Sequence, residues 1–597
     1  MIFKKIIFYS MFLILGYGFW VSPNFKEISA GVAIFLFGML SLEEGFRAFS
    51  GGVLEKILKS FTNRLYKSIT FGFIATALMQ SSSLVSVLTI SFIGAGLIGL
   101  TQGVGIILGA NIGTTTGAWL MAGFGLKVKI SAYAMPMLVF GVLLIFQKSK
   151  SLKGVGYILT GLGFLFLGIH YMKEGFESFK DGVNLAQYAV SGFKGILIYI
   201  GIGVLATVIM QSSHATIMLV LAALASGQIN YENAVALTIG ANIGTTITAI
   251  IGSLSSNIDG KRLAAAHFIF NIVTALISLA IFDQILYAVD YISNFLGIDS
   301  SNHTLRLALF DSMFKIGGVI IFIPFVDKLV SFLKSFIKAE DISDKEIQRA
   351  IYLNESALEL PTTAIIALEK ETKRLYDNAV KVIAHSINVK PENIFSQKAI
   401  DEVLKDKFDK SGNYNFNEDY NKNIKALYGD ILAFSTKAQK IVSQDYAEQI
   451  YNLKNAGRDI IRATKHAKHL HINLRKYTLD ENKYIKEEYT KIAKRIIKLL
   501  RKIDAIKESK DESKIKQMLQ KAKKLLIKND IIANGKLDKL IRKNLITNEM
   551  ATSLMNDSSY ATDLIRDIIT AATELYIKQK DDQNGDSIDK EALQEEQ

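Results

Sequence analysis

Cysteine is absent from the 597 residues of the chain, which excludes disulfides and cysteine-ligated metal centres. Proline and glycine are scarce beyond residue 338, where only two of the five prolines and five of the 43 glycines lie. Charge is missing from the whole stretch between Lys67 and Lys127. An uncharged stretch of that length is enough for about two to three membrane spans of roughly 20 residues each.

The charged residues divide the chain into two halves. Residues 1–338 carry 23 Lys and Arg with 14 Asp and Glu, whereas residues 339–597 carry 46 and 42. The basic residues of the first half cluster between apolar runs, which is typical of topology determinants and not of a nucleic-acid-binding surface. We therefore expect an all-α polytopic membrane protein that carries a soluble helical bundle at its C-terminal end.

One stretch occurs twice in the membrane half. It reads Gln-Ser-Ser-Ser at residues 80–83 and Gln-Ser-Ser-His at residues 211–214, each after a Gly-x-x-Ala-Thr lead-in. An identical heptapeptide, Gly-Ala-Asn-Ile-Gly-Thr-Thr, follows at residues 109–115 and 240–246. The first motif and the heptapeptide recur at one and the same offset, which indicates an internal duplication.

Each Gln-Ser-Ser motif falls within a long apolar run, where a polar cluster would lie near the middle of the bilayer. We predict a broken or re-entrant hairpin, with one half-helix ending at Met79, a turn at the motif, and a second half-helix running through Ile90. Irregular backbone at that depth is tolerated only where it faces protein or a wet cavity. The glycines and threonines of the heptapeptides predict a second interrupted helix in each copy. Such repeats, commonly inverted, build transporters with one site between the two halves.

The patterns also predict domain boundaries. Residues 1–22 favour a retained first span over a signal peptide, because Ser22-Pro23 indicates a turn and not a cleavage site. Two mixed-charge stretches, Arg47–Lys67 and Glu177–Lys194, are expected at the membrane interface. The predicted parts are 1–27 (first span), 28–150 (repeat 1), 151–338 (repeat 2 and last span), 339–578 (soluble bundle) and 579–597 (disordered tail).

The duplicated motifs can bind ions of both signs. Gln, Ser and Thr side chains supply donors and acceptors without fixed charge, while half-helix ends add N–H groups for an anion and carbonyls for a cation. The alternative is that these small polar residues only let helices pack closely, which the duplication in register disfavours. The fourth residue of copy two is a histidine that either contacts the ligand or fills space. The candidate substrate- and sodium-binding residues are Gln80, Ser81, Ser82, Ser83, Asn111, Thr114, Thr115, Gln211, Ser212, Ser213, His214, Asn242, Thr245 and Thr246.

Asp311 and Lys315 are spaced four apart and enter the last apolar run. Such a pair is more typical of a satisfied structural ion pair, but charges inside a membrane also indicate function. His170 and His267 lack enough neighbouring ligands for a metal site and are expected to form interhelical hydrogen bonds.

At these residues the chain resembles a known family. Gln80-Ser-Ser-Ser83 and Gln211-Ser-Ser213, with their lead-ins and the two heptapeptides, resemble the type II sodium/phosphate cotransporters over about residues 28–330. The resemblance implies an inverted-repeat carrier of inorganic phosphate and sodium, with both held at the paired turns. The chain departs from that pattern at His214 and in its last span. There Asp311 to Lys315 replaces a His-Thr-x-Phe-Asn type sequence, whereas His267 and Asn271 retain the corresponding pattern.

The soluble half has apolar residues at helical spacing in five segments. A helical bundle placed after a transporter of this kind resembles the PhoU-like domains attached to bacterial members of the family. Asp563 and Asp567 share one helix face, and His466, His469 and His471 lie among lysines. We interpret both groups as solvated and leave any metal of the bundle open. The predicted helical segments are Ile351–Ile387, Ile424–Leu474, Tyr484–Ile506, Ile515–Ile527 and Leu545–Ile577.

Together these features predict a secondary active transporter, not an enzyme, that carries phosphate with Na+ and needs no cofactor. Its expected place is the inner or plasma membrane, with the bundle in the cytoplasm and no nucleic-acid partner; a homo-oligomer is compatible with the sequence. The alternatives are a phosphate exporter, a carrier of another oxyanion, or a membrane-tethered phosphate sensor or scaffold.

Overall fold

The computed structural model describes most of the chain, and the residues form helices and no strands within the ranges that it describes. It divides into two compact units, of which unit 1 comprises Met1–Glu340 with Asn354–Thr363 and unit 2 comprises Asp341–Leu353 with Ala364–Gln597. The described residues are 12–13, 15–49, 64–125, 131–180, 192–338, 347–409, 414–442, 444–508, 513–515, 517–521 and 535–577.

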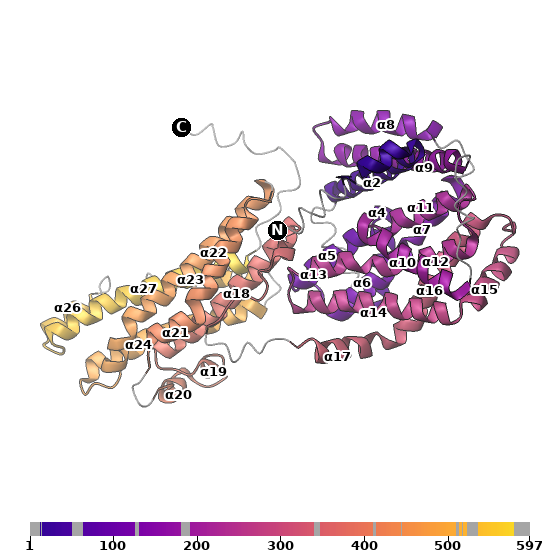
Figure 1. The fold of residues 1–597 in the computed structure, drawn as a ribbon. Helices are drawn as coiled ribbons and strands as arrows, with labels where there is room; N and C mark the ends of the chain where they lie inside the picture. The colour runs from indigo at the N-terminus through magenta and orange to yellow at the C-terminus, as the bar shows by residue number, and fades with distance from the viewer. Residues whose placement is uncertain are drawn as a thin grey trace. The chain divides into compact units, whose positions relative to one another are not determined.

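Unit 1 contains the apolar helices of the chain (Figure 1). Seven of its described helical stretches are long and apolar enough to cross a membrane, which confirms the prediction of a multi-pass membrane protein. The helices are α2 (Pro23–Phe49), α4 (Leu65–Met79), α5 (Ser82–Gly94), α6 (Leu100–Gly113), α7 (Thr115–Leu120), α8 (Ser131–Ile145), α9 (Lys150–Lys180), α10 (Gly192–Met210), α11 (Ser213–Ala225), α12 (Tyr231–Gly244), α13 (Thr246–Ser253), α14 (Ile258–Ala280), α15 (Phe282–Phe295), α16 (His303–Phe322) and α17 (Val326–Phe336).

Helices α2 and α9 pack against each other through glycines. A Cβ built on Gly31 would lie 2.9 Å from the carbonyl oxygen of Gly168, and one on Gly38 would lie 2.8 Å from that of Gly161. Only glycine permits backbones to approach this closely, as in small-residue interfaces of membrane helices. Because rising numbers on α2 face falling numbers on α9, the two helices run antiparallel.

A second close helix pair occurs twice, once in each copy of the duplication. A Cβ on Gly72 of α4 would lie 2.0 Å from the carbonyl oxygen of Ile106 on α6. A Cβ on Gly203 of α10 would lie 2.2 Å from that of Leu237 on α12. Gly72 and Gly203 open the lead-ins of the two motifs, so equivalent glycines make the same backbone contact in both copies. These pairs place the end of each first half-helix beside the helix that carries the heptapeptide.

The last apolar run changes helix type at its proline. Helix α16 gives way to a 3₁₀ turn, Ile323–Phe325, before α17 begins. Pro324 lacks the N–H that an α-helix would need at this point, which accounts for the change of helix type. About half of the predicted first span and most of the two interfacial stretches lie outside the described residues.

Unit 2 is a helical bundle in which α23 and α27 pack along each other. Two sequence predictions for it are wrong in their bounds. Residues 351–360 are not α-helical, because Pro361 begins the helix and suits its first turn. The predicted segment Ile424–Leu474 contains two helices, the first of which ends before residues 439–442, and the predicted Ile515–Ile527 helix and the tail lie largely outside the described residues. Its main helices are α18 (Pro361–Ser386), α22 (Ala426–Ala438), α23 (Gln444–Tyr477), α24 (Lys483–Glu508) and α27 (Asn548–Tyr576).

Candidate functional site

The first Gln-Ser-Ser motif breaks a helix. Gln80 has a left-handed backbone, with φ of 53°, and ends α4 after Met79. Ser81 then caps α5, its Oγ accepting a hydrogen bond from the N–H of Leu84 at 3.2 Å. Serine is favoured as an N-cap because its oxygen satisfies a free N–H of the first turn. The predicted half-helices are present, while their re-entry into a membrane stays a prediction.

The second motif has the same backbone. Gln211 has φ of 54° and follows the end of α10 at Met210. Ser212 caps α11 and accepts a hydrogen bond from the N–H of Ala215, again at 3.2 Å. A left-handed non-glycine residue is uncommon, so its occurrence at both glutamines shows that the motif specifies this turn.

The two motifs approach one another at Gly117. A Cβ there would lie 1.9 Å from Cε1 of His214, which belongs to copy two, and 2.5 Å from Oε1 of Gln80, which belongs to copy one. The His214 ring also stacks on Phe35 of α2, with 5.9 Å between ring centroids. Gly117 therefore leaves the room in which side chains of both motifs meet.

A reciprocal contact occurs on the other copy. Thr248 is the counterpart of Gly117 in the duplication, and its Oγ1 donates to Oγ of Ser83 at 3.4 Å. Ser83 is in turn the counterpart of His214. The fourth residue of each motif thus contacts the short helix that follows the heptapeptide of the other copy. Neither Gly117 nor Thr248 was among the sequence-predicted residues, although their equal distance from the motifs along the chain could have indicated them.

The glutamines differ in their surroundings. Gln80 is 8% exposed, and its Nε2 donates to Oγ1 of Thr116 at 3.1 Å and to the carbonyl of Ala77. Gln211 is exposed, and the residue at the position of Thr116 is Ile247. The structure therefore brings Gln80 into the contact between copies and leaves Gln211 outside it. Ser212 and Ser213 are buried, whereas Ser81, Ser82 and Ser83 are half-buried.

The heptapeptides carry buried polar side chains at helix junctions. Asn111 and Asn242 each donate from Nδ2 to the carbonyl four residues back, at 3.0 and 2.9 Å. Helix α6 ends at Gly113 and α7 begins at Thr115, and copy two breaks in the same way, although the residue between the helices keeps right-handed helical angles. The predicted interruption is thus one residue wide in each copy. Thr114, Thr115, Thr245 and Thr246 are all buried.

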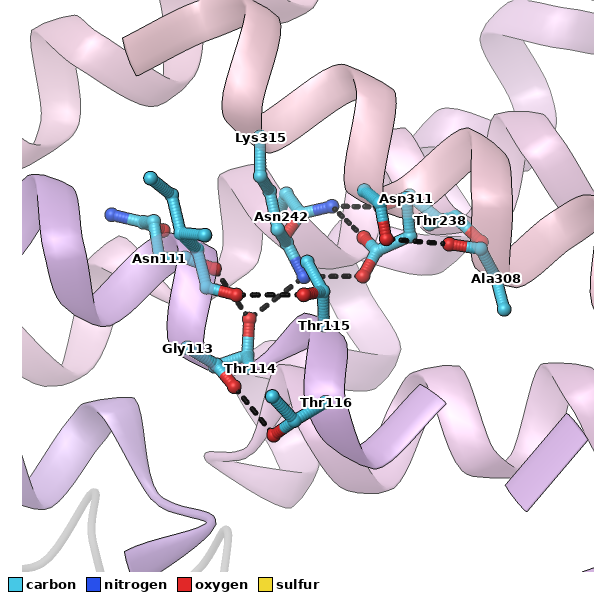
Figure 2. Close-up of polar contacts among 12 residues, drawn as sticks. Asn111, Gly113, Thr114, Thr115, Thr116, Thr238, Asn242, Ala308, Asp311 and Lys315 are labelled. Carbon is cyan, nitrogen blue, oxygen red and sulfur yellow. Dashed lines mark hydrogen bonds and ion pairs between the residues drawn. The ribbon is translucent and has the colours of Figure 1, made fainter. Parts of the chain in front are cut away.

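An ion pair on α16 joins the two heptapeptides (Figure 2). Lys315 Nζ lies 2.7 Å from Oδ2 of Asp311 and donates to Oγ1 of Thr114 at 2.8 Å. Asn242 Nδ2 donates to the other carboxylate oxygen of Asp311 at 3.3 Å. Lys315 is 2% exposed and Asp311 is 1% exposed. The predicted pairing is confirmed, but its place between the two motifs could not be anticipated from the sequence.

The two histidines expected to bond between helices lie apart from these contacts. His267 is buried, and Asn271 Nδ2 donates to its carbonyl at 3.0 Å. The Nδ1 of His267 has no hydrogen-bond partner among the described residues, and a small apolar pocket between α6 and α14 borders its ring. His170 Nε2 lies 3.4 Å from Oε1 of Glu174, one turn along the same helix. Within the part of the chain that the structure describes, the expected interhelical hydrogen bonds are therefore not seen.

The bundle corrects two interpretations of its charged residues. Asp567 is buried and not solvated, since α27 packs on α23 and brings the side-chain nitrogens of Arg462 and His466 to 3.3 and 3.4 Å from its carboxylate. His466 is accordingly half-buried, while His469 is exposed as predicted.

Burial, aided by the Asp459 carboxylate, raises the pKa of Glu574 to about 7. Among the described residues, no three His, Asp or Glu are grouped to hold a metal ion.

Comparison with known proteins finds similar chains in bacteria. The Escherichia coli (strain K12) protein YjbB, whose name describes a candidate inorganic phosphate export protein, is 26% identical over 353 residues. That match covers 59% of this chain and 62% of YjbB, so the chain spans less than two thirds of this relative. The uncharacterized protein YqeW of Bacillus subtilis (strain 168) is 25% identical over 335 residues, which are 53% of this chain and 98% of YqeW.

A shorter match reaches an animal protein. The sodium-dependent phosphate transport protein 2C of Rattus norvegicus is 35% identical over 91 residues, or 15% of this chain and 14% of that protein. No solved structure matched the chain. The family model described as Na+/Pi-cotransporter matches residues 34–174 and 184–297, which include both Gln-Ser-Ser motifs and both heptapeptides. Through these residues, the chain is similar to the Na+/Pi-cotransporter family.

Proposed function

We propose that the chain carries inorganic phosphate across the cell membrane together with sodium ions. The observation that supports this most is the meeting of the two motifs at Gly117, where Gln80 of one copy and His214 of the other border the same space. Helices α5 and α11 begin at these motifs. Free N–H groups and the positive dipole end of such helices favour an anion, so phosphate is assigned to this region.

The cation partners are assigned to the heptapeptides. Their threonine hydroxyls donate to carbonyls of their own helices, as Thr115 does to Ile112 at 2.8 Å, so the hydroxyl oxygen can still accept a hydrogen bond or ligate a cation. Hard cations prefer such oxygen ligands. Moving an anion into a negative cell costs about 2.3 kcal/mol per charge per 100 mV, which co-transported sodium would offset.

Alternating access is the proposed mode of movement. Helices α2 and α9 carry the same Gly-x5-Glu-Gly-Phe pattern, which begins at Gly38 and again at Gly168, and they run antiparallel. Antiparallel packing of matching helices supports inverted repeats, whose halves rock about a shared site. The bundle is proposed to be PhoU-like, cytoplasmic and regulatory, since exposed basic residues such as Lys328 and Lys334 precede it.

Export is the second candidate for the direction of movement. The name of YjbB, which matches over 353 residues, describes phosphate export. The same site can serve either direction, because the gradients of phosphate and of the coupled cation decide the net flux. Another oxyanion of similar size and charge would use the same groups.

The test is flux of radiolabelled phosphate in proteoliposomes that contain the full chain. We expect inward flux that requires an inward sodium gradient, with choline replacing sodium in the control. Flux that proceeds only outward would favour export, and sulfate carried as well as phosphate would broaden the substrate. Phosphate binding without flux in either direction would contradict transport and favour a sensor.

A further inference from the structure

Lys315 has the surroundings of a bound cation. Among the described residues it is the only buried lysine, and its ammonium has a carboxylate oxygen of Asp311 and the hydroxyl of Thr114 within 2.8 Å. An ammonium group has three donors and no acceptor, so it is matched by the same oxygen ligands that suit a hard metal cation.

The ammonium also lies where the two copies meet. Thr114 belongs to the heptapeptide of copy one, while Asp311 accepts from Asn242 in the heptapeptide of copy two. Figure 2 shows Lys315 projecting from α16 to a point between them. A charge bound there affects both copies together, as a transported cation at the same point would.

A neighbouring helix offers an uncharged counterpart. Helix α14 carries His267 and Asn271 at the same spacing of four residues that separates Asp311 and Lys315 on α16. Asn271 bonds to the carbonyl of His267 within its own helix. The second residue of the pair is thus a neutral amide, Asn271, on α14 and a positively charged lysine, Lys315, on α16.

We propose that Lys315 is a tethered cation that fills one cation position of this carrier, so that the chain binds one sodium ion fewer than it would with a neutral residue at 315. The inference rests on the proposed function, because it concerns the cations coupled to phosphate. The opposing view is a purely structural salt bridge. Removing the lysine from such a bridge would leave a buried carboxylate uncompensated and create no affinity for sodium.

Thermal unfolding of the full-length protein in detergent separates the two views without phosphate. Wild type, Lys315→Asn and the neutral double variant Asp311→Asn/Lys315→Asn are each measured in NaCl and in choline chloride at equal ionic strength. We expect Lys315→Asn to unfold several degrees higher in NaCl than in choline, beyond any difference in wild type, because a bound ion stabilises the folded state. The double variant loses this extra response because the carboxylate that holds the ion is gone. The exposed Lys334→Asn serves as the matched control and should behave as wild type.

Each outcome decides the proposal. A Lys315→Asn protein that is equally unstable in both salts, or misfolded in both, overturns it, as does an extra sodium response that persists in the double variant. Because these measurements contain no phosphate, they are independent of the flux assay. If the wild-type protein fails to move phosphate, the proposed function is wrong. The sodium-dependent unfolding of Lys315→Asn is measured separately and would still test whether Lys315 occupies a cation site.

Discussion

The two copies of the Gln-Ser-Ser motif share a backbone and differ in what surrounds it. Gln80 and Gln211 adopt φ angles of 53° and 54°, and each is followed by a serine that caps the next helix. Yet Gln80 is buried and donates to Thr116, while Gln211 is exposed. Copy two has Ile247 at the position of Thr116. The duplication thus preserves the turn, and single residues outside it decide which glutamine faces the contact between copies.

This comparison indicates an asymmetric site. Copy one contributes a buried amide, and copy two contributes a buried histidine at the same point, against Gly117. Copy one also supplies Thr114 to the ammonium of Lys315, whereas copy two supplies Asn242 to the carboxylate of Asp311. A symmetric ligand cage would need equal groups from both copies, so we expect equivalent substitutions to have unequal effects.

The largest effect is expected from Gln80→Ala. Its buried amide is lost from the contact between the motifs, and we expect phosphate flux to fall about 100-fold, equivalent to about 2.7 kcal/mol. Gln211→Ala is the matched control and should lower flux only a few-fold, because that side chain is exposed. Flux in proteoliposomes at equal protein insertion measures both, and equal losses would contradict the asymmetry.

Gly117→Ala tests the meeting point itself. The added methyl would overlap His214 and crowd Gln80, so one or both must move. Overpacking of this kind costs about 1–3 kcal/mol, and we expect a lower unfolding temperature together with reduced flux.

The neighbouring Gly123→Ala is the control for Gly117→Ala. A Cβ there meets nothing within 4 Å, so it should leave stability and flux close to wild type. If both alanine variants behave alike, the close approach of the two motifs at Gly117 is wrong.

The sequence predicted the parts of this arrangement that depend on local chemistry. Helix breaks at Gln80 and Gln211 follow from polar clusters within apolar runs and from serines that suit helix caps. Contacts between distant residues could not be predicted in this way. Thr114 and Lys315 lie far apart along the chain, and nothing in the pattern around either one indicates the other.

The same limit applies in the bundle. Periodicity located α23, α24 and α27, but it placed Asp567 on a solvated face, because it does not reveal which polar residues a neighbouring helix will cover. The helix expected over residues 351–360 fails for a local reason that was visible, namely that Pro361 favours a helix start over a helix interior.

The smallest expected effect comes from making the copies alike. Ile247→Thr places a hydroxyl in copy two where Thr116 accepts from Gln80 in copy one. Since the two backbones match, Gln211 can then turn inward and donate to it, and such a hydrogen bond stabilises by about 0.5–1.5 kcal/mol net. We expect a small rise in unfolding temperature that is absent in Ile247→Val, which shortens the side chain without adding a hydroxyl.

A double-mutant cycle isolates that bond. Ile247→Thr is combined with Gln211→Ala, and the coupling between the two substitutions is measured from unfolding temperatures in the same detergent. Coupling of about 0.5 kcal/mol or more would mean that position 247 alone keeps Gln211 exposed. If the two substitutions add without coupling, the outward position of Gln211 has another cause. The nearest one is Thr248, because its side chain stands at the position where Gly117 leaves room for the amide of Gln80 in copy one.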